Sequence, residues 1–144
     1  MRRVVLDTNV FLDCWVFEDA AARPLRAALE MGRVLPVRSA ATDAELVDVI
    51  ARPQFAARAA AGKTLLDWWQ RQARLIEVTA VAPVRCSDPA DQRFLDLAFA
   101  AQAHALVTKD KALLATAPTA RRHHLFVVPP DRAESVLLVE DRLA

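Results

Sequence analysis

Short runs of β-branched and aliphatic residues alternate along the chain with longer amphipathic segments. Five runs have the length and composition of buried strands, at residues 3–6, 34–37, 75–79, 105–108 and 125–128. The segments between them carry the apolar spacing of helices, at residues 9–16, 20–31, 42–52, 63–74, 90–103 and 111–115. Pro129 and Pro130 end the last strand. This alternation predicts an α/β fold, with a central parallel sheet and helices on both faces.

The composition favours one domain over residues 1–144, because 54% of the chain is hydrophobic and no linker or repeat interrupts it. No apolar run reaches the roughly 18–20 residues that span a bilayer. The first residues carry no secretion signal, so we expect a cytoplasmic protein with no membrane partner. Cys14 and Cys86 follow no metal or redox spacing, which predicts buried thiols.

Charge and glycine content restrict how the protein would handle phosphate. The net charge of +1 gives no global basic field that would indicate a nucleic-acid binder. Gly32 and Gly62 are the only glycines and lie far apart, whereas a phosphate-binding loop needs clustered glycines. Any contact with phosphate therefore depends on side chains or metal ions.

Two aspartates stand where a predicted strand ends. Asp7 directly follows the first strand, and Asp110 follows the fourth after Lys109. The carboxyl ends of parallel strands share one edge of a sheet, where ligands bind near the switch in strand order. Each aspartate taken alone is typical of a helix N-cap, so a binding role depends on which groups lie beside it.

Two further acids stand at the starts of predicted helices. Glu45 follows Thr42 at the spacing of a capping box and also lies at the margin of the inward stripe of its helix. Asp91 follows Asp88, the natural N-cap before Pro89, and lies on the apolar face of its helix. Three neighbouring acids on these helices lie on other faces. Asp43 and Asp48 are expected to be surface charges, and Asp96 is expected to be a surface charge or an outer group of the site.

Four carboxylates at one edge of a sheet would repel one another and raise one another's pKa values unless a cation compensates them. Carboxylate oxygens suit Mg²⁺ or Mn²⁺ rather than zinc. Ions held in this way leave positions for water and phosphate, and they allow hydrolysis without a nucleophilic side chain. The pattern therefore predicts metal-dependent chemistry on phosphate esters.

Four blocks, in this order, resemble the signature of PIN domains. They are VVLDTNVFL at residues 4–12, TDAEL at 42–46, DPADQRFLDLA at 88–98 and LVTKDKALL at 106–114. The resemblance implies a three-layer α/β/α fold with four or five parallel strands. It also implies a Mg²⁺- or Mn²⁺-dependent endoribonuclease, similar to the VapC-like toxins of bacterial toxin–antitoxin pairs. RNA would be the substrate, and the partners would be a small antitoxin that blocks the active-site groove and a second copy of the chain.

The resemblance also assigns roles to individual residues. Metal-binding and catalytic roles fall on Asp7, Glu45, Asp91 and Asp110. Supporting roles fall on Thr8, Asn9, Thr108 and Asp88, and Asp88 competes with Asp91 as the nearer metal ligand. Lys109 stands where a small residue is common, which leaves two interpretations, a contact with substrate phosphate or a solvent-exposed side chain.

Other interpretations of the same residues stay open. A phosphatase on a similar sheet would need a second carboxylate at residue 9, where this chain has Asn9. A non-catalytic PIN-like binding module would keep the fold without turnover. His123 and His124 are interpreted as a polar loop before the last strand, since Arg121 and Arg122 beside them would disfavour a cation.

Overall fold

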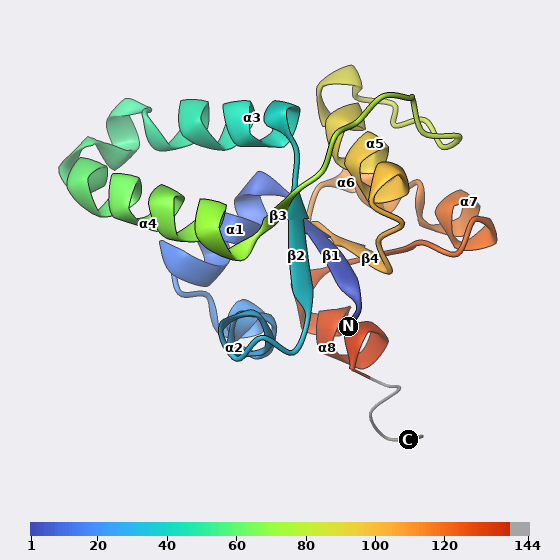
Figure 1. Cartoon of the computed structure of the whole chain (residues 1–144), viewed down its shortest axis with the longest axis horizontal. Helices are drawn as coiled ribbons and strands as arrows, with labels where there is room; N and C mark the ends of the chain where they lie inside the picture. The colour runs from blue at the N-terminus through green and yellow to red at the C-terminus, as the bar shows by residue number, and fades with distance from the viewer. Residues whose placement is uncertain (139–144) are drawn as a thin grey trace.

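A computed structural model describes residues 1–138, except the side chains of residues 56–61. Residues 139–144, which the expected domain includes, lie outside the described residues. The centre is a sheet of five parallel strands in the order β3-β2-β1-β4-β5 (Figure 1). The strands are β1 (Arg3–Leu6), β2 (Leu35–Arg38), β3 (Arg74–Leu75), β4 (Ala105–Val107) and β5 (Phe126–Val128). The predicted parallel α/β sheet is confirmed.

Helices cover both faces of the sheet (Figure 1). On one side lie α1 (Thr8–Trp15), α2 (Arg23–Glu30) and α8 (Pro130–Leu137), with the pair α3 (Ala40–Ile50) and α4 (Ala59–Gln72) beside them. On the other side lie α5 (Gln92–Ala100), α6 (Lys111–Leu114) and α7 (Ala117–Arg122). Short 3₁₀ turns occur at Ala20–Ala22, Pro53–Arg58 and Pro89–Asp91. Among the described residues, no helix has the length and apolar character needed to cross a membrane.

The alternation of side chains along the strands builds two cores. Val4 and Leu6 of β1 pack into the core beneath α1 and α2, whereas Val5 between them packs into the core beneath α5. In β4, Leu106 likewise faces away from Ala105 and Val107. Strands that are buried on both faces have near-continuous apolar sequences, which is why these runs stood out from the helices.

The strand order places a switch point between β1 and β4. From β1 the chain builds the sheet outward through β2 and β3 in one direction, and through β4 and β5 in the other. Loops that leave two such strands diverge, and the space between them is the usual ligand position in an open α/β sheet. Asp7 and the segment Thr108–Asp110 leave the sheet at this point.

The structure differs from the sequence expectations at three elements. The third strand contains only Arg74 and Leu75, because the chain leaves the sheet after the Ile76 N–H bonds the Arg38 carbonyl. Helices α7 and α8 were not expected. Each has a proline in its first turn, where the missing N–H costs nothing. In α8 the prolines that end β5 therefore also start a helix.

Candidate metal centre

Asp7 lies at the carboxyl end of β1 with its side chain directed to β4. Its backbone N–H donates to the Val107 carbonyl at 3.0 Å, and its carboxylate accepts the Thr108 hydroxyl at 2.7 Å. Although Asp7 occupies the N-cap position of α1, its side chain makes no capping hydrogen bond. Burial raises the pKa of Asp7, and the Thr108 hydroxyl acts in the opposite direction. The carboxylate is therefore held in place at the end of β1.

The loop after β4 positions Asp110 by two hydrogen bonds. The Asp110 backbone N–H donates to the Thr108 hydroxyl oxygen at 3.0 Å. The Asp110 carboxylate accepts the Leu113 N–H at 3.0 Å and so caps α6, which confirms the N-cap interpretation for this residue. Because Thr108 is fully buried and bonds to both segments, it couples the positions of Asp7 and Asp110.

Glu45 approaches the same edge from α3. The expected cap at Thr42 is wrong, because α3 begins two residues earlier with Ser39 as N-cap and Thr42 as its capping-box partner. Ser39 has the extended backbone that an N-cap needs, and its side chain accepts the Thr42 N–H. Glu45 is thus not used in capping, and it accepts the Thr8 hydroxyl at 2.6 Å.

Asp88 and Asp91 have different roles: Asp88 caps a helix, and Asp91 lies near the other acids. Asp88 is exposed and accepts the Ala90 N–H at 3.0 Å, which confirms its expected N-cap role. Asp91 is half-buried, and its pKa is raised to about 7. Burial is the largest cause, followed by the charges of Asp110 and Asp7 and a hydrogen bond with the Asp110 carboxyl. Neighbouring negative charges and burial thus disfavour the ionised form of Asp91.

The four predicted acids lie close enough at one edge of the sheet for their charges to affect one another. Asp7 is affected by the charges of Glu45 and Asp110, and Asp91 is affected by those of Asp110 and Asp7. Hard carboxylate oxygens with raised pKa values are the donor set that a divalent cation stabilises. Within the described chain, however, no three acidic, histidine or cysteine side chains are already arranged to hold a metal ion. The donor chemistry fits Mg²⁺ or Mn²⁺, and a bound cation would favour the ionised form of Asp91.

The remaining predicted residues have mixed environments. Thr8 is buried and bonds Glu45, whereas Asn9 is exposed at the start of α1. Lys109 forms an ion pair with Asp13, 2.6 Å between Nζ and Oδ2, so its ammonium has a protein partner. His123 and His124 are exposed after α7, in the polar loop expected of them.

Asp43, expected at the surface, and Asp96, expected at the surface or as an outer group of the site, both have structural roles. Asp43 pairs with Arg38 at 2.5 Å between Oδ2 and Nη1, with both side chains largely buried. Asp96 accepts the Ala82 N–H at 2.8 Å and the Gln92 amide at 3.0 Å, and so anchors the loop before α5. Helical periodicity could indicate the Gln92 contact, which lies four residues before Asp96 on α5. It could not indicate Arg38 or Ala82, because these partners lie outside the helix of each acid.

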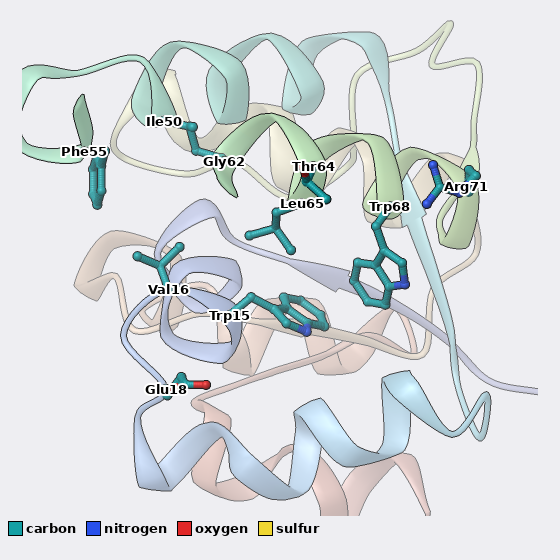
Figure 2. A pocket seen from close by; sticks show the side chains of 10 residues that line it. All are labelled: Trp15, Val16, Glu18, Ile50, Phe55, Gly62, Thr64, Leu65, Trp68 and Arg71. Carbon is teal, nitrogen blue, oxygen red and sulfur yellow. The ribbon is translucent and has the colours of Figure 1, made fainter. Parts of the chain in front are cut away.

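A separate apolar pocket of about 700 Å³ lies between α1 and α4 (Figure 2). Figure 2 shows Trp15, Leu65 and Trp68 around its space, with Glu18 and Arg71 at its ends. Trp15 and Trp68 contact each other edge to face, with ring centroids 5.1 Å apart. The four acids are not part of the pocket lining, so this surface is distinct from the candidate metal centre.

The chain matches the family model of the PIN domain over residues 3–112. It therefore belongs to the PIN domain family. Among solved structures, it is similar to the crystal structure of VapBC2 from Rickettsia felis bound to a DNA fragment from their promoter. The TM-score is 0.59 at 15% identity, and the match covers 87% of this chain and 96% of that chain, which is a likeness of fold. A comparison with curated proteins gives no match.

Proposed function

We propose that this PIN-domain protein is a Mg²⁺- or Mn²⁺-dependent endoribonuclease that acts as the toxin of a toxin–antitoxin pair. The observation that carries the proposal is the meeting of Asp7, Asp91 and Asp110 at the switch point of the sheet, with raised pKa values for Asp7 and Asp91. Membership of the PIN domain family and the similar fold of a VapBC2 structure support it.

Each acid has a defined part in this proposal. Asp7, Asp91 and Asp110 would hold the cation, with Glu45 directed to the same edge by Thr8. A bound divalent ion would supply a water of lowered pKa and positive charge opposite the phosphodiester. The hydrogen bond that Thr108 donates favours the ionised form of Asp7, and the Leu113 N–H orients Asp110.

The test is cleavage of a structured RNA in Mn²⁺ or Mg²⁺ by the wild type and by Asp7→Asn and Asp91→Asn. We expect both variants to lose at least about a hundredfold in rate, since each removes a charge that binds the cation. Asp48→Asn is the matched control, because Asp48 is exposed on α3 and its ion pair with Arg52, at 3.8 Å, is exposed as well. Wild-type cleavage that is unchanged in EDTA would overturn the proposal.

One observation favours a second candidate, a PIN-like module that binds without turnover. Within the described residues no three acids are already arranged to hold a metal ion, and a degenerate site would have the same feature. Titration with Mn²⁺ by calorimetry separates the two candidates. The nuclease requires saturable binding that Asp91→Asn weakens, whereas a degenerate module requires negligible binding in the wild type.

We further propose an antitoxin partner and self-association as a homodimer. Support for the antitoxin comes from the similar fold of the VapBC2 structure, which contains a bound promoter DNA fragment. Co-expression with the protein encoded beside the gene, followed by light scattering, tests both points. A monomeric chain that forms no complex with that protein would overturn them.

A further inference from the structure

Outside the acidic cluster, α1 carries another buried carboxylate. Only 8% of the Asp13 side chain is exposed. Within the described part of the chain its Oδ2 atom accepts no hydrogen bond of normal geometry, and the Lys109 ammonium lies 2.6 Å from it. Burial of a carboxylate costs free energy unless an opposite charge compensates it. Lys109 is therefore held by Asp13, although 47% of its own side chain is exposed.

This ion pair joins the two segments that leave the switch point. Lys109 lies between Thr108, which donates to Asp7, and Asp110, which caps α6. Asp13 lies on α1, the helix that starts directly after Asp7. The two loops are thus connected at two places, once through Thr108 on the inner side and once through the ion pair on the outer side.

We propose that Asp13 and Lys109 are positioning residues, whose ion pair fixes the Thr108–Asp110 loop on α1 and so sets the separation of the Asp7 and Asp110 carboxylates. The inference rests on the proposed nuclease function only where activity is the readout. It gives Lys109 a role other than a contact with substrate phosphate. A loosened loop would let Asp110 move relative to Asp7, and catalysis is sensitive to displacements of about 1 Å.

The two roles of Lys109 predict opposite effects of Asp13→Asn. If Lys109 were a phosphate contact, removal of the Asp13 charge would release the ammonium and strengthen RNA binding. If the pair positions the loop, Asp13→Asn weakens catalysis as Lys109→Met does, and the double variant adds little to either. Lys109→Arg keeps the charge and should retain most of the activity.

The experiment measures kcat and KM for RNA cleavage in Mn²⁺, and RNA affinity in EDTA by fluorescence anisotropy, for these four variants. We expect kcat to fall about tenfold in both single variants and in the double variant, with KM and RNA affinity within about twofold of wild type. Lys111→Met is the matched control, since Lys111 is an exposed lysine in the next turn. Tighter RNA binding by Asp13→Asn, or wild-type kcat in both single variants, would overturn the inference.

Hydrogen exchange keeps the test independent of nuclease activity. The Asp110 and Leu113 amides donate to Thr108 and Asp110, so they report directly on the loop. We expect these amides to exchange about tenfold faster in Asp13→Asn and Lys109→Met than in wild type or Lys111→Met. If the wild type cleaves no RNA but these amides respond, the proposed function fails and the positioning role stands. Unchanged exchange in both variants would overturn the positioning role.

Discussion

The Thr108 hydroxyl donates to the Asp7 carboxylate across 101 residues of sequence, at 2.7 Å and in a fully buried position. The same hydroxyl oxygen accepts the Asp110 N–H at 3.0 Å. One side chain at the end of β4 thus orders an acid from each side of the switch point. A carboxylate that loses such a donor in a buried position becomes harder to ionise.

We therefore expect Thr108→Val to destabilise the fold by about 1.5–3 kcal/mol, the usual effect of losing a buried hydrogen bond to a charged group. We also expect Mn²⁺ affinity to fall at least fivefold, because Asp7 loses the donor that favours its ionised form. Urea unfolding and calorimetry measure the two effects. Thr116→Val is the control, since Thr116 is also buried but donates to the Leu113 carbonyl away from Asp7. Equal Mn²⁺ affinity in the two variants would contradict the assignment.

The raised pKa of Asp91 predicts how stability depends on pH when no metal is present. Its pKa is about 7 in the folded protein against an ordinary value of 3.8, so the folded state binds the proton more tightly than the unfolded chain. This carboxyl therefore opposes folding progressively as pH rises from about 4 to 7. After allowance for solvent screening of a half-exposed group, the loss is on the order of 1–2 kcal/mol.

Asp91→Asn should remove this dependence, because the amide imitates the protonated acid. In EDTA we expect the variant to be more stable than wild type at pH 7.5 and nearly equal to it at pH 4.5, by urea unfolding at both values. Mn²⁺ should stabilise the wild type more at pH 7.5 than at pH 5.5. If the difference in unfolding free energy between wild type and variant were the same at both pH values, the pKa of Asp91 would not be raised in the folded protein.

Arg38 predicts a stability effect away from the acidic edge. Besides its pair with Asp43, its guanidinium donates to the Gln70 and Ala73 carbonyls, both at 3.1 Å, at the end of α4. Arg38→Met would remove the Arg38 partner of Asp43 and both hydrogen bonds to these carbonyls, and we expect a loss of about 2–4 kcal/mol in urea unfolding. Arg52→Met should change stability by less than about 0.5 kcal/mol, because the Arg52–Asp48 pair is exposed.

Two adjacent tryptophans should differ strongly in their contribution to stability. Trp69 is 5% exposed and packs edge to face on Phe11, whereas Trp68 is half-buried beside the pocket of Figure 2. We expect Trp69→Ala to cost about 3–5 kcal/mol and Trp68→Ala about 1–2 kcal/mol in urea unfolding. Similar losses in both variants would show that the two side chains are equally embedded.

Local pattern was sufficient for the features that depend on neighbouring residues. Apolar runs predicted β1, β2, β4 and β5 within one or two residues, since strands buried on both faces must be apolar. The expected cap at Asp88 is confirmed, because a cap depends on residues within one turn. The cap interpretation open to both Asp7 and Asp110 holds for the side chain of Asp110 alone. The order of the strand ends also placed Asp7 and Asp110 at the same edge.

Tertiary structure decided which polar groups meet. Glu45 bonds Thr8, although the sequence indicated only its place near the inward stripe of its helix. Asp43 pairs with Arg38 and Asp13 pairs with Lys109, and nothing in the spacing of these four residues distinguishes them from surface charges. The choice of Ser39 rather than Thr42 as the cap of α3 likewise followed from the backbone at the end of β2. Burial and pairing of a charge depend on groups that the fold brings from distant parts of the chain. Sequence therefore located the acids, and packing determined the environment of each one.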